Sequence, residues 1–199
     1  WSPDGQRLLY ASRNDGEAQI YVRWMDSGQV ARITRCSKSP GSMAWSPDGR
    51  WIAFSMSVPD ETKPFVEMPA KPEGAEWAKP PKTIRRMMYR TDEEGYLEGA
   101  HKQLFVVPAD GGTPHQLTRG PFDHEGPFAW APDGKAIIFS ANRHEDWEYQ
   151  PLNSEIYEVS IGDRGIKVLT ARNGPDQEPA LSPDGRQIAY LGFDDRYRG

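Results

Sequence analysis

The stretch "WSPDGRWIAFSM" at residues 45–56 decides the fold, because close copies of it occur three more times in the chain. The copies are "WSPDGQRLLYAS" at 1–12, "WAPDGKAIIFSA" at 130–141 and "LSPDGRQIAYLG" at 181–192. Each copy starts with Trp or Leu, passes through a Pro-Asp-Gly turn and ends in a short apolar run. A sequence that returns at intervals in this way is typical of a repeat architecture.

A second landmark keeps a constant distance in three of the copies. A further apolar run begins with an aliphatic residue, and a threonine follows 14 residues later: Ile20 and Thr34, Leu104 and Thr118, Ile156 and Thr170. The segment between the two apolar runs is the part that varies in length, and it is longest in the second copy. Insertions therefore fall in one type of loop, as expected when each repeat is one supersecondary unit.

These spacings predict four short antiparallel strands per unit, joined by Asp/Gly turns, which describes a β-propeller blade. We expect an all-β fold: a partial β-propeller of TolB-like or WD-like four-stranded blades, with two complete and two partial blades. A sandwich is the alternative, but it has no need of near-identical repeats. The chain is predicted to be a fragment of an N-terminal propeller domain, with units 1–40, 41–125, 126–176 and 177–199 and a proline-rich insertion at 58–99.

Composition limits the classes of partner. The formal net charge of -5 and a pI near 5.4 argue against nucleic acid, which requires a clustered basic surface. The sequence has no run of about 20 apolar residues, so we expect no membrane span. Cys36 is the single cysteine, which excludes an internal disulfide and fits a cytoplasmic location. It lacks a His or basic cluster, so an idle or buried thiol is predicted.

The recurring polar and aromatic residues have structural interpretations. The aspartates of the Pro-Asp-Gly turns are predicted to hold the turns, not to act as acids or metal ligands, because a ring of blades keeps them apart. Trp1, Trp45 and Trp130 are predicted to belong to the core. His124-Glu125 and His144-Glu145-Asp146 would bind a metal only if the fold joined them, so we predict no metal site and no cofactor.

Several segments together resemble a known family. "KQLFVVPADGGTPHQLT", "FSANRHEDWEY", "SEIYEVSIGD", "IAYLGFDDRYRG" and the insertion "KPEGAEWAKPPKTIRRMMYRTDEEGYLEG" are similar to the propeller of the prolyl oligopeptidase family of serine peptidases. The likeness is to bacterial members of the acylaminoacyl-peptidase and dipeptidyl-peptidase type. TolB-like propellers share the Pro-Asp-Gly repeat, and a non-enzymatic TolB-like protein-interaction module is the alternative function.

The resemblance implies a role in a larger peptidase. Members of the family carry an α/β-hydrolase domain with a Ser-Asp-His triad, and the propeller restricts access to short peptides. The chain has no G-x-S-x-G motif, so no catalytic residue is assigned and the chain alone is expected to be inactive. The expected partners are the hydrolase domain of the same parent chain and short peptides, and a homo-oligomer is possible for such a protein.

Two segments are candidate contact sites. The loop "NRHEDWEY" at 142–149 gathers charge and aromatic side chains, and the substrate-binding candidates are Arg143, Glu145, Asp146, Trp147 and Glu148. They could pair with the terminal amine or carboxylate of a peptide, or the loop could satisfy itself while Trp147 packs on a neighbouring blade. The insertion could form a wall or lid, an oligomer contact or a plain surface excursion, and an extra strand or edge segment is predicted at 83–90.

Overall fold

The computed structural model describes residues 1–13, 16–60, 69–76, 84, 86–92, 95–97, 99–124 and 126–197. Within these ranges the chain forms strands and turns, and a 3-10 helix, η1 (Asp195–Tyr197), lies near the end. The strands are β1 (Arg7–Ser12), β2 (Gln19–Trp24), β3 (Val30–Arg32), β4 (Pro40–Trp45), β5 (Trp51–Pro59), β6 (Arg90–Thr91), β7 (Gly95–Tyr96), β8 (Ala100–Pro108), β9 (His115–Gln116), β10 (Ala129–Trp130), β11 (Ala136–Ala141), β12 (Glu155–Ser160), β13 (Ile166–Val168), β14 (Asp176–Leu181) and β15 (Ile188–Gly192).

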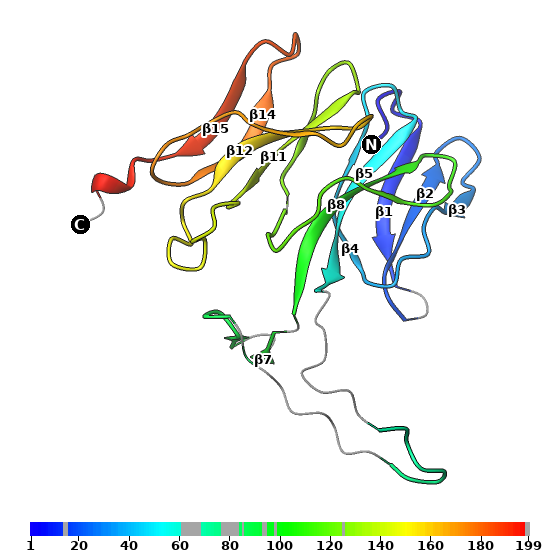
Figure 1. Cartoon of the computed structure of the whole chain (residues 1–199). Coiled ribbons are helices and arrows are strands. Elements are labelled where there is room, and N and C mark those ends of the chain that lie inside the picture. The colour runs from blue at the N-terminus through cyan, green and yellow to red at the C-terminus, as the bar shows by residue number, and fades with distance from the viewer. Residues whose placement is uncertain are drawn as a thin grey trace.

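The strands form successive antiparallel sheets that we number as blades. Blade 1 has the order β1-β2-β3, blade 2 β4-β5-β8-β9, blade 3 β10-β11-β12-β13 and blade 4 β14-β15. Figure 1 shows these sheets side by side in an arc. Strand β10 contacts both β4 and β14, so the first strands of blades 2 to 4 lie together on the inner side. The predicted fold class, an all-β partial propeller with two complete and two partial blades, is confirmed.

The Ser-Pro-Asp-Gly turn of blade 2 is held by its own side chains. The Ser46 hydroxyl donates to Asp48 Oδ1 (2.6 Å) and accepts from the Trp51 N–H (2.9 Å), while Asp48 Oδ1 also accepts from the Arg50 N–H (3.0 Å). The hydrogen bond from Ser46, followed by that from the Arg50 N–H, lowers the pKa of Asp48 to about 2. Gly49 has a φ of 67°, a conformation that favours glycine. The aspartate holds the turn, as the sequence predicts.

The same turn recurs with one departure. Blades 1 and 4 repeat the serine-to-aspartate bond, from Ser2 to Asp4 (2.5 Å) and from Ser182 to Asp184 (2.6 Å). Blade 3 has Ala131 at the serine position, so Asp133 keeps its bond from the Lys135 N–H (3.0 Å) but has no hydroxyl beside it there. The turn therefore forms without the serine, because the aspartate and glycine remain.

The constant threonine lies just beyond the outer strand in blades 1 to 3. In blade 2, Thr118 Oγ1 accepts from the Leu104 N–H (2.9 Å) and donates to Gln103 Oε1 (2.8 Å). The matching sets are Thr34 with Ile20 and Gln19 in blade 1, and Thr170 with Ile156 and Glu155 in blade 3. The hydroxyl replaces a backbone carbonyl as partner of the third strand. The outer strand can therefore end early without leaving that N–H unpaired.

The core consists of the seams between blades. Ile52 and Phe54 of β5 pack toward blade 1, whereas Ala53 packs toward blade 3, as the alternation of side chains along a strand requires. An aromatic pair spans the two middle strands of each of blades 1 to 3 in direct register: Tyr10 with Tyr21, Phe54 with Phe105, and Phe139 with Tyr157. The ring centroids are 5.5 to 5.7 Å apart.

Two expectations from the sequence need correction. Trp130 is buried, at 8% exposure, and Trp45 is half-buried, but Trp1 is 66% exposed and is not part of the core. The reason is that no strand of the described chain lies along the edge of β1 that would correspond to the β4 edge of β5. The middle strands of blade 2 are also longer than predicted, because the β5–β8 ladder continues from Trp51 opposite Pro108 to Pro59 opposite Ala100.

Candidate functional site

The middle loops of blades 2 and 3 lie at the same end of the arc, opposite the Ser-Pro-Asp-Gly turns (Figure 1). The connection from β5 to β8 carries the insertion, and the connection from β11 to β12 carries the 142–149 segment. The backbone N–H of Met87 donates to Glu148 Oε1 (3.2 Å), so the two loops touch. Of the predicted edge segment at 83–90, residues 83 and 85 lie outside the described residues, and strand β6 begins at Arg90.

The predicted contact residues of the 142–149 loop separate into two groups. Glu145 and Asp146 are exposed, and Asp146 Oδ2 accepts from Gln150 Nε2 (2.5 Å) within the loop. Trp147 is half-buried and packs edge-on against the His101 ring of blade 2, with centroids 6.2 Å apart. The acids therefore face solvent, whereas Trp147, like Glu148, contacts the neighbouring blade. The loop residues do not converge on a single point.

Arg143 forms the centre of a cluster at the seam of blades 2 and 3. Its Nη1 contacts Nε2 of the fully buried His124, and its guanidinium lies over the Phe122 ring (4.9 Å) and the Tyr157 ring (5.9 Å). His124 Nδ1 lies 3.3 Å from the Lys102 carbonyl. Burial, and then the Arg143 charge, lower the pKa of His124 to about 4. A neutral ring that donates from Nδ1 and accepts from Arg143 at Nε2 satisfies both contacts.

A second group of charges adjoins this cluster at the root of the insertion. Asp60 Oδ2 accepts from Arg86 Nη2 (2.7 Å), and its Oδ1 lies 3.4 Å from Nε2 of the buried His101. His101 Nδ1 lies 3.7 Å from Asp123 Oδ1. Burial acts to raise the pKa of Asp123, but contacts with His101 and the Lys102 N–H outweigh it and lower the pKa. Because Asp60 lies near the start of the insertion and Arg86 lies within it, these contacts hold two parts of the insertion against His101 of blade 2.

We call these residues the seam cluster: Asp60, Arg86, His101, Asp123, His124, Arg143, Trp147 and Glu148. Among the described residues, no carboxylate lies within ion-pair distance of Arg143. Burial also lowers the pKa of Arg143, although an arginine remains charged at neutral pH. A half-buried cation without an acidic partner can bind a carboxylate or polarise a carbonyl.

Sequence reasoning identified Arg143 and Trp147 but missed His101, His124 and their partners. His101 and Asp60 come together because Val58 of β5 pairs with His101 of β8. Asp60 directly follows the end of β5, and its N–H donates to the Gly99 carbonyl just before β8. The sequence alone does not predict this pairing, because the long insertion separates the two strands and hides their register. The available signal was a pair of histidines, His101 near the start of β8 and His124 between β9 and β10, whose positions in the fold periodicity alone does not predict.

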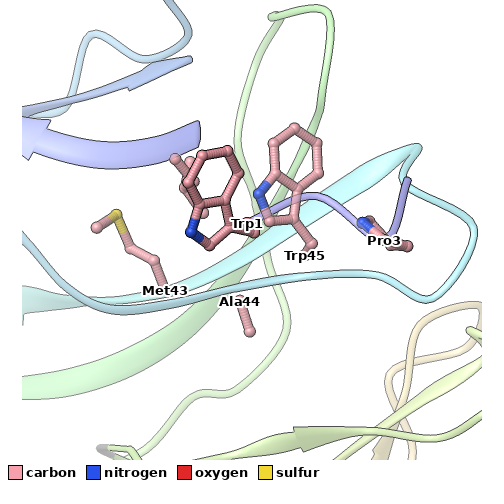
Figure 2. Close-up of a pocket in the computed structure, with 6 residues that line it drawn as sticks. Trp1, Pro3, Met43, Ala44 and Trp45 are labelled. Atoms are coloured by element: carbon pink, nitrogen blue, oxygen red, sulfur yellow. The ribbon is translucent and has the colours of Figure 1, made fainter. Parts of the chain in front are cut away.

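A hollow of about 370 Å³ lies between blades 1 and 2, away from the seam cluster. It is bordered by Trp1, Pro3, Leu9, Met43, Ala44 and Trp45. Figure 2 shows the indole rings of Trp1 and Trp45 side by side at this hollow. None of its lining residues has an acidic or basic side chain that could perform proton transfer or pair with a charge.

Other site types find no support in the described part of the chain. No group of three or more His, Cys, Asp or Glu residues there is arranged to hold a metal ion. Of the His124-Glu125 pair, residue 125 lies outside the described residues, and His124 contacts Arg143. Burial raises the pKa of the half-buried Cys36, which favours the thiol over the thiolate. No helix in the described residues is long and apolar enough to cross a membrane.

The blade order and the repeated turns define the class of this protein, a β-propeller of antiparallel blades. The family described as "Dipeptidyl peptidase IV (DPP IV) N-terminal region" matches residues 60–189. The chain belongs to this family, and it is a propeller of the kind found in prolyl oligopeptidase-family peptidases. The resemblance inferred from the sequence is thereby confirmed.

Individual relatives fall into two groups. The uncharacterized peptidase YuxL of Bacillus subtilis is 32% identical over 73% of this chain, and the match spans 22% of that protein. The Tol-Pal system protein TolB of Francisella tularensis is 24% identical over 98% of this chain and 45% of that protein. The structure of Pyrococcus horikoshii acylaminoacyl peptidase has a TM-score of 0.61 at 16% identity, over 97% of this chain and 30% of that one. The chain spans less than half the length of each of these proteins.

Proposed function

We propose that this propeller serves a serine oligopeptidase of the acylaminoacyl-peptidase type, in which it packs against an α/β-hydrolase domain of the same parent chain and admits short peptides. The family match and the peptidase relatives support this assignment. Hydrolysis in the parent would proceed by acyl transfer through a serine nucleophile of that domain. The propeller would contribute size exclusion and charged contacts.

One observation carries the substrate-contact role. The insertion and the 142–149 loop meet at the same end of the arc, and Arg143 of that loop, which contacts His124, has no carboxylate partner among the described residues. The exposed Glu145 and Asp146 belong to the same loop. A short peptide has one ammonium and one carboxylate, so acids and an arginine that belong to the same loop offer a group of opposite charge to each of its ends.

The test uses the protein produced together with its downstream sequence, and it measures kcat and KM for a series of peptides of increasing length. The double variant Glu145→Ala/Asp146→Ala and the variant Arg143→Met are expected to raise KM for short peptides about tenfold, the loss of roughly one charge-assisted bond. The control Asp26→Ala/Asp110→Ala removes two exposed acids from turns outside the 142–149 loop. Unchanged KM values in both test variants would contradict the contact role.

A non-enzymatic propeller is the second candidate, because the TolB relatives match nearly the whole chain. In that case the protein would act as a protein-interaction module. A downstream G-x-S-x-G motif in the gene supports the peptidase, and its absence there supports the interaction module. We also propose that the peptidase is cytoplasmic and that it self-associates. Fractionation of cells tests its location, and its mass in solution tests its oligomeric state.

A further inference from the structure

The hollow between blades 1 and 2 lies along an edge of β1 that no strand of the described chain covers (Figure 2). In blades 2 and 3, the strands that correspond to β1 are β5 and β11, and each has a first strand beside it, β4 or β10. Among the described strands, β1 has only β2 as a neighbour. Leu9 of β1 and Ala44 of β4 both line the hollow, so it occupies the place where a first strand of blade 1 would lie.

The residues that line this hollow favour a polypeptide as its occupant. Their only polar groups are backbone atoms and the indole N–H groups of Trp1 and Trp45. A charged small molecule would lose its hydration there without meeting an oppositely charged side chain. An extended polypeptide instead presents backbone groups to a strand edge and side chains to the space beside it, which is how a strand is added to an exposed sheet edge.

The indole N–H of Trp45 indicates where one backbone group of the occupant lies. Trp45 Nε1 is buried and has no hydrogen-bond partner in the described chain, although a buried indole N–H normally has one. Trp130, the matching tryptophan of blade 3, donates from Nε1 to the carbonyl of Ala44 (3.3 Å), which directly precedes Trp45. The same contact made by Trp45 would reach the carbonyl of a residue that directly precedes Trp1.

The backbone of β1 directs hydrogen-bonding groups to the same edge. On the side away from β2, the Arg7 carbonyl accepts from the Ser2 N–H (2.9 Å), and the Arg7 N–H donates to the Ser2 hydroxyl (2.9 Å). Backbone groups alternate between the two sides of an antiparallel strand, so those of Leu9 and Ala11 point to the same side as those of Arg7. Leu9 and Ala11 therefore offer a hydrogen-bonding ladder to a further strand.

The register of the other blades indicates which residue type this strand needs. The residue before each repeated Trp or Leu is an alanine that pairs with the residue nine positions further along: Ala44 with Ala53, Ala129 with Ile138, and Ala180 with Ala189. The corresponding residue of blade 1 is Leu9. Ala44 packs against the hydrophobic cluster that contains Trp130, so a small side chain leaves room for the indole ring. We therefore expect Ala, Gly or Ser opposite Leu9.

We infer that a strand of the parent chain, joined directly to Trp1, pairs antiparallel with β1 and fills the hollow between blades 1 and 2. Such a strand continues an interface that the structure already has, because β10 contacts both β4 and β14 in the row of inner strands. It would cover Trp1, which is 66% exposed, as the first strand and its neighbours cover Trp130, which is 8% exposed. The inference does not depend on peptidase activity, since a TolB-like module would need the same strand.

The test compares this chain with a longer version that also carries the residues encoded directly upstream of Trp1. Amide hydrogen exchange of Leu9 and Ala11, measured by NMR, is expected to be at least about tenfold slower in the longer chain, because each gains a ladder hydrogen bond. The amides of Leu8 and Tyr10, which face β2, are the internal control and should change less. Equal exchange rates of Leu9 and Ala11 in the two chains would overturn the inference.

Variants locate the contact at Trp45. Trp45→Phe keeps an aromatic ring but removes the N–H, so it should lower the urea midpoint of unfolding more in the longer chain than in this one. The matched control Trp130→Phe removes an N–H whose acceptor, the Ala44 carbonyl, is present in both chains, so it should lower the midpoint equally in both. Equal shifts for Trp45→Phe in the two chains would contradict the contact.

Two further observations distinguish this strand from other occupants. If exchange of Leu9 and Ala11 in this chain slows as the concentration rises, and the mass in solution doubles, a second copy covers the edge and the inference is wrong. A bulky residue directly before Trp1 in the gene would also contradict it. Either failure leaves the proposed peptidase function intact, because its kinetic test changes residues of the 142–149 loop, which do not line this hollow.

Discussion

Blades 2 and 3 have the same strand order but differ in the length of their middle strands and in a few side chains. Both sheets have an aromatic pair across their middle strands and a Pro-Asp-Gly turn between their first two strands. In both, a threonine hydroxyl accepts from a backbone N–H of the third strand. Blade 2 extends its middle strands to nine residues each to carry the insertion, whereas those of blade 3 have six. The shared positions define the blade, and the differences mark what is particular to this protein.

Three differences are informative because the remaining framework is shared. Gln103 of blade 2 corresponds to Glu155 of blade 3, and Ser46 corresponds to Ala131. The seam between the two blades contains His124, six residues before Trp130, whereas the seam between blades 3 and 4 has Pro175 at the same distance before Leu181. Each difference can be reversed by one substitution, which shows whether the position belongs to the framework or to the seam.

The largest expected effect concerns His124 and pH. Its folded pKa of about 4 lies below the ordinary value of 6.5, so protonation favours the unfolded chain. The stability that the neutral ring contributes is complete above pH 6.5 and is lost as pH falls toward 4, about 3 kcal/mol in total. Urea unfolding at pH 7.0 and 4.5 measures this loss. His124→Gln should flatten the dependence, and His115→Gln, at an exposed position, should not.

The second-largest effect on stability is expected from Gln103→Glu in blade 2, and it is compared with Glu155→Gln at the equivalent position of blade 3. Gln103 Nε2 donates to the carbonyls of Gly120 (3.0 Å) and Phe122 (3.1 Å), so Gln103→Glu places a carboxylate against two carbonyl oxygens and should cost about 2 to 3 kcal/mol. Glu155→Gln should cost about 1 kcal/mol or less. Gln19 occupies the equivalent position in blade 1, and its Oε1 accepts from both the Thr34 hydroxyl and the Cys36 N–H. A glutamine can therefore make the contacts that Glu155 makes in blade 3. Equal costs for the two variants would contradict this asymmetry.

The smallest effect concerns the turn of blade 3. Ala131→Ser restores the hydroxyl that in blade 2 joins the turn aspartate to the next strand, and it should stabilise the protein by about 0.5 to 1.5 kcal/mol. Ser46→Ala should destabilise blade 2 by a similar amount. Thermal unfolding of both variants measures the pair. If Ala131→Ser has no effect while Ser46→Ala destabilises, the turn of blade 3 is held by contacts that blade 2 lacks.

The features that could be predicted from the sequence are those with local causes. The Pro-Asp-Gly turns depend on residues within five positions, and the threonine acts across a fixed 14-residue distance, so repetition made both visible. The cross-strand aromatic pairs were missed, although an aromatic recurs nine positions after each copy begins, at Tyr10, Phe54, Phe139 and Tyr190. Aligning the copies against the second apolar run would have revealed the pairs in blades 1 to 3.

The candidate site was predicted only in part because it depends on contacts distant in sequence. Arg143 was identified from its loop, but its position between Phe122, His124 and Tyr157 follows from the packing of one blade on another. Burial of His101 requires the ladder across the insertion. Trp1 was predicted to be in the core because it occupies the repeated position, but it is exposed. Within the described chain, no strand lies beside β1 to cover it.

The threonines that end the outer strands also bear on how the protein behaves at high concentration. Because a hydroxyl satisfies the third strand, the outer strands β3, β9 and β13 have only two or three residues. A short edge offers few unpaired backbone groups to a neighbouring molecule, and Arg32 and Lys167 add charge to two of these edges. The outer rim of the arc is thereby a poor template for the edge-to-edge pairing that starts β-aggregation.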